Sequence, residues 1–231
     1  LGDDADGHIL KSQAQREGLD CARLLTLPGC RTTFTDAFAS EETGRRTHLY
    51  YPGTSGLLTP DHFQFEGSRA RILHLGLPGL HEKMDEPWNG DPSGWVTVLK
   101  GARAAGIKTN LEMCSLPAPR LLEVVAPCLG HLDYLIINDF EVAAISQRPI
   151  RHGEDVDLRD FLANAKDVFD RSSVELLVVH FPRGAIAMQR GADPLVIPSV
   201  AVPKEAIAGS NGAGDAFASG ILYGLHQGWR L

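Results

Sequence analysis

The stretch Asp133-Tyr134-Leu135-Ile136-Ile137-Asn138-Asp139-Phe140-Glu141 contains the pattern that decides the fold of this chain. Residues 134–137 form a short continuous apolar run, and polar residues follow it at once. An apolar run of this length is typical of a strand that is buried on both faces of a parallel sheet. The stretch therefore predicts a central strand that ends in a polar edge.

The same alternation extends in both directions along the chain. We expect further strands at residues 71–75, 107–111 and 174–179, and helices at 94–105, 119–129, 158–169 and from about residue 212. Strands that alternate with helices indicate a parallel sheet with helices on both faces. The expected fold is a Rossmann-like, three-layer α/β fold, in which helices flank a mostly parallel central sheet.

A β-hairpin is expected ahead of these units, at residues 31–51. Its two strands are rich in Thr and aromatic residues, and the polar segment Glu41-Glu42-Thr43-Gly44 connects them. We expect the hairpin to stand apart from the sheet as a small antiparallel lid on a single domain, residues 1–231. An α/β domain normally has a strand before its first loop, so we also expect segments at both ends to lie outside these residues.

Composition narrows the class of protein. The 231 residues are 43 % hydrophobic and 22 % charged, as in ordinary globular proteins, and a net charge of -7 argues against nucleic-acid binding. The four cysteines form no CxxC pair, which favours reduced thiols and a cytoplasmic location. No apolar run approaches the length of a membrane span, so we expect no membrane partner.

The most informative segment for chemistry is Gly209-Ser210-Asn211-Gly212-Ala213-Gly214-Asp215-Ala216-Phe217-Ala218-Ser219-Gly220. A glycine-rich turn here leads into a helix, so backbone N–H groups and the helix dipole can form an anion hole. A carboxylate beside such a hole, here Asp215, can take a proton from an attacking hydroxyl. The alternative is an ordinary aspartate at a helix start.

Asn138 and Glu141 form a second candidate pair, because they follow a buried strand at the edge where open α/β sheets bind ligands. The alternative is helix capping, with Asn138 as N-cap and Glu141 three residues later. The two interpretations are compatible.

The string GAGDAFASG at residues 212–220 resembles the C-terminal signature of the ribokinase family, the PfkB-type carbohydrate kinases, and Asn138-x-x-Glu141 resembles its N-x-x-E motif. The resemblance implies that Asp215 is the catalytic base and that Gly212, Ala213 and Gly214 supply the anion hole. It also implies a nucleotide site, with Mg²⁺ held by Glu141 through water. Its cofactor-binding residues are Asn138, Glu141, Gly184 and Asn211.

Some positions depart from the family pattern. Gly209-Ser210 replaces Asp-Thr, and Gly209 has no side chain to hold an activating monovalent cation, so we expect little effect of potassium on turnover. Residues 110–114 lack the Asp-x-Asn-x-Arg of many sugar kinases. Glu112 either substitutes for its Asp or is a surface acid at a strand end. The scattered histidines, His74, His131 and His180, are expected to be structural.

The resemblance implies an ATP- and Mg²⁺-dependent kinase that transfers the γ-phosphoryl group to a hydroxyl of a sugar or sugar-like small molecule. One alternative is a nucleoside kinase of the same family. Another is a non-catalytic sugar- or nucleotide-binding protein on the same scaffold. Lid hairpins of this family can pair between subunits, so a homodimer through the lid is a further expectation.

Overall fold

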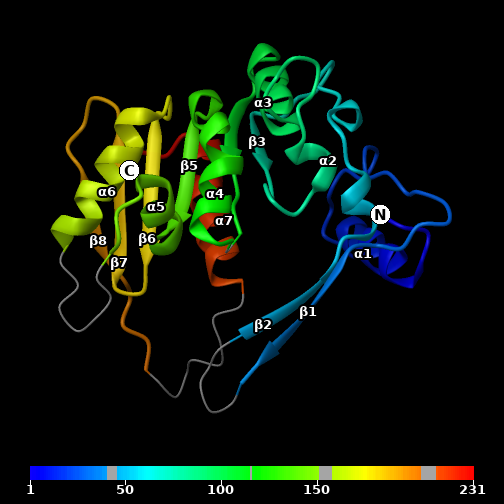
Figure 1. Cartoon of the computed structure of the whole chain (residues 1–231), viewed down its shortest axis with the longest axis horizontal. Coiled ribbons are helices and arrows are strands. Elements are labelled where there is room, and N and C mark those ends of the chain that lie inside the picture. The colour runs from blue at the N-terminus through cyan, green and yellow to red at the C-terminus, as the bar shows by residue number, and fades with distance from the viewer. Residues whose placement is uncertain (41–45, 115, 151–157, 204–211) are drawn as a thin grey trace.

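Six strands form the central sheet and follow one another in chain order from β3 to β8 (Figure 1). The computed structural model describes residues 1–40, 46–114, 116–150, 158–203 and 212–231. Strands β3 to β6 are parallel, and β7 and β8 extend the sheet as antiparallel strands. The expected mostly parallel sheet is confirmed. Its strands are Ile72–Leu75, Lys108–Leu111, Tyr134–Asn138, Leu176–Phe181, Gly184–Gln189 and Leu195–Pro198.

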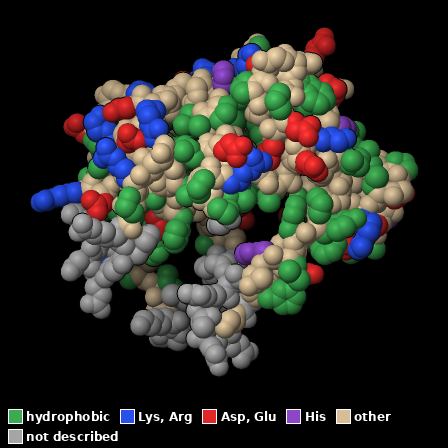
Figure 2. Space-filling model, viewed as in Figure 1, with side chains coloured by type: hydrophobic (Ala, Val, Ile, Leu, Met, Phe, Trp, Pro, Cys, Tyr) green, Lys and Arg blue, Asp and Glu red, His purple; other side chains and the backbone are tan. Residues whose placement is uncertain are grey.

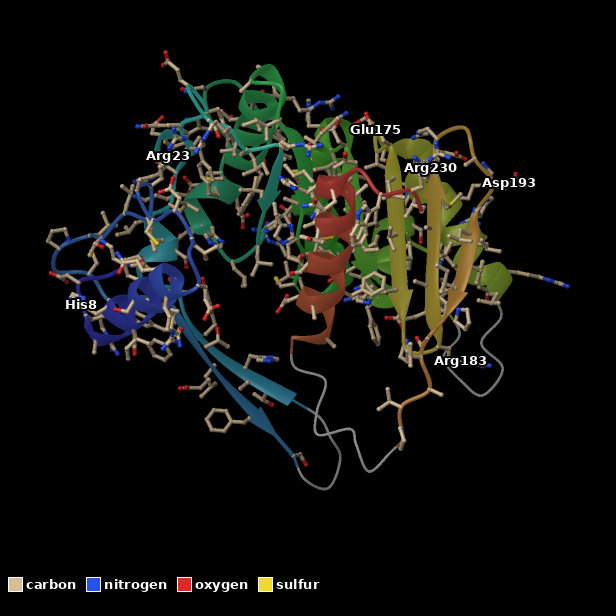
Figure 3. The ribbon with its side chains drawn as sticks, turned by 180° about the vertical axis from the view of Figure 1, so that it is seen from behind. His8, Arg23, Glu175, Arg183, Asp193 and Arg230 are labelled. Carbon is tan, nitrogen blue, oxygen red and sulfur yellow. The ribbon has the colours of Figure 1, made fainter. Side chains whose placement is uncertain are left out.

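Alternating burial along β5 shows why the fold has three layers. Leu135 and Ile137 belong to one core cluster, whereas Ile136 belongs to another on the opposite face of the sheet. Helices α3 to α6 contribute to the first cluster, and α7 alone among the described helices contributes to the second (Figures 1 and 3). These helices span Gly94–Ala104, Ala118–Val125, Asp139–Ser146, Leu158–Arg171 and, for α7, Ala213–Gln227.

Local sequence signals explain where several helices begin and end. Helix α1, Ala5–Arg16, begins after Asp4, whose side chain accepts a hydrogen bond from the Gly7 N–H and caps the helix. Helix α4 ends at Val125, short of the expected residue 129, and a 3-10 helix, Ala126–His131, follows. Pro127 accounts for this change, because proline cannot donate the hydrogen bond that continues an α-helix.

The expected hairpin is present and forms a sheet of its own. Strands β1, Phe34–Ala39, and β2, Arg46–Tyr51, pair antiparallel with each other and with no strand of the central sheet. The connecting residues 41–45 lie outside the described residues. In Figure 1 the hairpin projects past the edge of the sheet at which α7 begins.

The base of the hairpin is fixed to the N-terminal segment by Asp4. Its carboxylate accepts hydrogen bonds from the Thr32 hydroxyl at 2.6 Å and from the Thr32 N–H at 2.8 Å. These bonds, together with the one from Gly7, hold the pKa of Asp4 at about 2. Asp4 therefore links the start of α1 to the chain that enters the hairpin.

Two further observations concern the cysteines and the length of the apolar helices. Cys21, Cys30, Cys114 and Cys128 are all free thiols. Within the described ranges, no helix combines the length and apolar character needed to cross a bilayer.

Leu135→Ala is expected to lower the free energy of unfolding by about 2–5 kcal/mol, because it removes a fully buried side chain from the central strand β5. Leu195→Ala is the matched control, since Leu195 is 39 % exposed on the edge strand β8. Urea denaturation of both variants measures the difference. Equal losses would contradict this assignment of the core.

Candidate active site

The first turn of α7 carries the main candidate residue. Gly212 has a left-handed backbone, with φ of 73°, and its carbonyl accepts the Ala216 N–H at 2.9 Å. Asp215 lies in this turn with an exposed side chain. The predicted glycine-rich entry into a helix is confirmed from Gly212 onward. Gly209 and Asn211 lie outside the described residues.

The N-terminus of α7 can accept an anion. The N-cap residue, Gly212, has no side chain, and no described residue supplies a capping bond to the N–H groups of the first turn, those of Ala213 and Gly214 among them. The helix dipole adds a partial positive charge at the same point. The carboxylate of Asp215 stands beside these donors. This combination can bind a phosphoryl group and accept a proton next to it.

Asn138 and Glu141 form a complete capping box at the start of α5. The Asn138 side chain accepts the Glu141 N–H at 3.0 Å, and a Glu141 carboxylate oxygen accepts the Asn138 N–H at 2.9 Å. The capping interpretation is therefore confirmed. Glu141 is 7 % exposed, and burial raises its pKa. The box holds this carboxylate at the carboxyl edge of β5.

Three polar side chains lie together at the ends of β3 and β4. His74 and Asn110 are paired across the two strands, and their Nδ1 and Nδ2 atoms are 2.8 Å apart. On its other side, His74 Nε2 is 3.3 Å from Oε2 of Glu112, the residue after β4. The sequence predicted His74 to be structural and left Glu112 open. The structure joins them through the strand register, which the sequence pattern alone does not reveal.

Electrostatic interactions connect this group to the other candidates. The pKa of Glu112 is raised to about 7, first by burial and then by the charges of Glu141 and Asp215. Burial lowers the pKa of His74, and Asp215 opposes that shift. Glu141 and Asp215 therefore each lie close enough to Glu112 to shift its pKa. Glu112 follows β4, Glu141 lies in the first turn of α5 after β5, and Asp215 lies in the first turn of α7. In Figure 1, α7 begins at the edge of the sheet that faces the hairpin.

The space around this edge is open. Figure 2 shows a hollow between the hairpin and the main body of the molecule. His180, on β6, packs its ring against Phe217 of α7 at 4.9 Å between centroids, and burial lowers its pKa. This contact matches the structural role expected for His180.

Gly184 begins β7, where it pairs with Phe181 at the end of β6. A side chain there would approach the Ile197 carbonyl oxygen of β8 to 2.4 Å, so close strand packing itself requires glycine. A cavity of about 250 Å³ lies beside it, lined by Leu158, Phe181, Arg183, Gly184, Val196, Ile197 and Pro198. Gly184 is thus at the same edge of the sheet but three strands along from β4.

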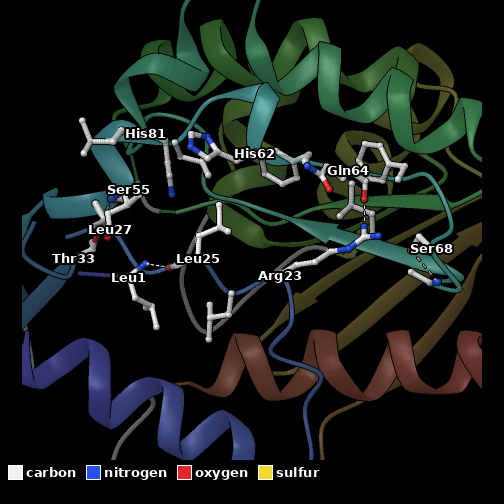
Figure 4. A pocket seen from close by; sticks show the side chains of 18 of the residues that line it. Leu1, Arg23, Leu25, Leu27, Thr33, Ser55, His62, Gln64, Ser68 and His81 are labelled. Carbon is white, nitrogen blue, oxygen red and sulfur yellow. Dashed lines mark hydrogen bonds between the residues drawn. The ribbon is translucent and has the colours of Figure 1, made fainter. Parts of the chain in front are cut away.

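A larger cavity of about 590 Å³ lies elsewhere (Figure 4). It is bounded by the N-terminal segment, by the short 3-10 helices Gly53–Leu57 and Pro60–His62 and by β3, and its walls are mainly apolar. Arg23 crosses its rim and donates a hydrogen bond to the Gln64 carbonyl. The lining includes none of the predicted site residues. Volume alone therefore does not locate the candidate active site.

The fold and the position of these carboxylates place the chain among the open α/β proteins that bind ligands at the carboxyl ends of their strands. The profile of the family described as "pfkB family carbohydrate kinase" matches residues 1–231. The chain belongs to this family, whose kinases are phosphotransferases. The resemblance seen in the GAGD and N-x-x-E segments is confirmed.

Individual relatives differ in the molecules that they are named for. Adenosine kinase 1 of Arabidopsis thaliana is 31 % identical over 137 residues, which are 54 % of this chain and 37 % of that protein. A Burkholderia thailandensis nucleoside kinase in complex with inosine superposes with a TM-score of 0.66 at 18 % identity, over 99 % of this chain. A Xylella fastidiosa fructokinase with bound ATP superposes with a TM-score of 0.69 at 20 % identity, over 98 % of this chain.

The two superpositions show a shared fold. Each covers 66 % of the solved relative, so the chain spans slightly less than two thirds of the length of these kinases.

Glu112→Gln is expected to stabilise the protein more at high pH than at low pH. The pKa of Glu112 is 4.5 in the unfolded chain and about 7 in the folded protein. Between these two pH values the folded protein keeps a proton on Glu112 that the unfolded chain releases. The free energy of unfolding therefore falls as the pH rises through this window. Glutamine has no charge to bury, so the variant should gain about 1–3 kcal/mol over the wild type above neutral pH.

Urea denaturation of both proteins on the acid and alkaline sides of this window measures the effect. Glu17→Gln is the control, because the Glu17 side chain is 73 % exposed. A Glu112→Gln difference that does not depend on pH would show that Glu112 ionises normally.

Proposed function

We propose that this chain is an ATP-dependent kinase that transfers the γ-phosphoryl group to a hydroxyl of a sugar-like small molecule. The observation that supports this most is the position of Asp215 in the first turn of α7, beside helix N–H groups that no side chain of the described residues caps. Membership of the pfkB family and the fold shared with a fructokinase that has bound ATP agree with it.

In the proposed reaction, Asp215 accepts the proton of the acceptor hydroxyl as its oxygen attacks the γ-phosphorus. The exposed carboxylate can reach a bound hydroxyl without a change in the fold. The N–H groups from Gly212 to Gly214 stabilise the negative charge on the transferring group. The bond from phosphorus to the β,γ-bridging oxygen breaks, and ADP leaves with that oxygen.

Mg²⁺ would be held near Glu141, mainly through water. Among the described residues, no group of three or more His, Cys, Asp or Glu is arranged to hold a metal ion directly. Mg²⁺ commonly keeps several waters and takes few protein ligands, and the fixed Glu141 carboxylate fits such a site. When bound, the ion would offset the charge of the triphosphate.

The remaining parts of the proposal concern the surroundings of this site. Asn138 is fixed by its capping bonds beside Glu141, and Gly184 borders the cavity at the end of β6. The proposal places the nucleotide on this side of the site. We also propose, from the sequence alone, that Asn211 contacts the nucleotide. The hairpin would act as a lid that excludes water, and a homodimer through it is part of the proposal. Free cysteines agree with a cytoplasmic location.

A nucleoside is the second candidate acceptor. The match to Adenosine kinase 1 and the absence of Asp-x-Asn-x-Arg at residues 110–114 both favour it. A coupled assay of ATP turnover across sugars, sugar acids and nucleosides would separate these acceptors. The non-catalytic alternative predicts ligand binding without any turnover.

Asp215→Asn is expected to reduce turnover by about 10²–10⁴-fold, because asparagine keeps the size of the side chain but is a very poor base. Binding of ATP and acceptor should change little. The measurements are steady-state kinetics, calorimetric binding and the melting temperature. Asp193→Asn, an exposed carboxylate near the turn between β7 and β8, is the control. Near-normal turnover with lowered stability would mean that Asp215 only supports the helix.

A further inference from the structure

The Oε2 atom of Glu112 is buried, although the side chain as a whole is partly exposed. Oε2 is buried without a hydrogen bond and has His74 Nε2 at 3.3 Å, whereas the side chain as a whole is 23 % exposed. Oε2 therefore contributes almost nothing to that exposed surface. We assign the contact with a molecule bound at this edge to the other oxygen, Oε1.

Asn110 and His74 can orient this carboxylate. If Asn110 Nδ2 donates to His74 Nδ1, the neutral ring carries its proton on Nε2 and directs it toward Glu112 Oε2. Burial keeps the pKa of His74 low, in agreement with a neutral ring. In this tautomer His74 lies between Asn110 and Glu112 and turns its Nε2–H toward Oε2, which is 3.3 Å away.

Asn110 also carries an unsatisfied polar group. The residue is 0 % exposed, and its Oδ1 atom has no hydrogen-bond partner. If the amide were rotated by 180°, Oδ1 would face His74 and Nδ2 would lose its contact with His74. In either orientation, His74 therefore contacts only one of the two polar atoms of the Asn110 amide. A buried polar atom without a hydrogen bond, such as Asn110 Oδ1, lowers the stability of the fold, so its presence needs an explanation. Holding His74 in a single orientation beneath a ligand site supplies one.

The charges around Glu112 indicate which ligands fit. The two charged groups that shift its pKa are Glu141 and Asp215, and both are anions that raise it. An acceptor with a carboxylate would add another anion to this group of acids. An uncharged acceptor would instead supply hydroxyl groups, which donate hydrogen bonds to carboxylate oxygens.

We propose that Glu112 binds a second hydroxyl of the acceptor, next to the one that faces Asp215, and that it selects uncharged polyhydroxy acceptors over sugar acids. Asn110 and His74 are positioning residues that act through Glu112. This inference rests on the proposed kinase function and narrows its acceptor class. It gives a role to three side chains, His74, Asn110 and Glu112, that the phosphoryl-transfer step does not use.

The test compares uncharged sugars and ribonucleosides with the corresponding sugar acids, both as ligands in calorimetry without ATP and as acceptors in turnover. The wild type should bind the uncharged member of each pair more tightly. At a pH above about 7, where Glu112 is ionised, Glu112→Gln should raise KM for the uncharged acceptor about 10- to 100-fold, as expected for loss of a hydrogen bond to a charged group, with little change in kcat. It should also reduce the discrimination against the acid.

Two further variants separate charge from geometry. Glu112→Asp keeps the charge, so it should raise KM yet still reject sugar acids. His74→Ala should raise KM in the same direction by a smaller factor, because the carboxylate remains but is less well oriented. Glu17→Gln, on an exposed surface, should change none of these quantities.

The outcomes distinguish the two proposals. A wild type that prefers sugar acids, or a Glu112→Gln variant with unchanged KM and selectivity, overturns the role of Glu112 while the kinase function stands. Selective binding of uncharged acceptors without turnover overturns the kinase function and leaves the binding role of Glu112. A wild type that binds no member of the panel overturns both.

Discussion

The structure depends on the burial of both faces of the central strands. In β5, Leu135 and Ile137 pack under helices α3 to α6, while Ile136 packs under α7. Parallel strands buried in this way must all end at the same edge of the sheet, and polar residues must take over there. The residues that follow β4 and β5, and the start of α7, are brought together by this requirement.

Three negatively charged side chains lie at that edge. Asp215, Glu141 and Glu112 come from three separate segments, and Glu141 and Asp215 both raise the pKa of Glu112. Carboxylates that lie close together repel one another, so nearby positive charge or hydrogen-bond donors are needed to offset that repulsion. The N-terminus of α7 supplies a partial positive charge beside Asp215, and the capping box gives Glu141 a backbone donor. Glu112 Oε2 has His74 Nε2 at 3.3 Å and no hydrogen bond from any of the described residues.

The hairpin of β1 and β2 lies on the side of this edge of the sheet. It is connected to the rest of the molecule through Asp4 and Thr32 at its base, and it forms no ladder with the central sheet. A two-stranded sheet with few neighbours is suited to local movement, because little buried surface opposes it. The separation between a rigid sheet edge and a thin hairpin agrees with the proposed lid.

The sequence by itself determined the α/β class, the separate hairpin and the helix start at Gly212, because apolar runs, turn residues and glycines act through neighbours in the chain. It also determined the capping box of Asn138 and Glu141, whose partners are three residues apart. Only the tertiary structure decided the grouping of His74, Asn110 and Glu112. His74 and Asn110 are 36 residues apart and meet through the register of β3 and β4, which depends on packing over the whole sheet and not on any local pattern.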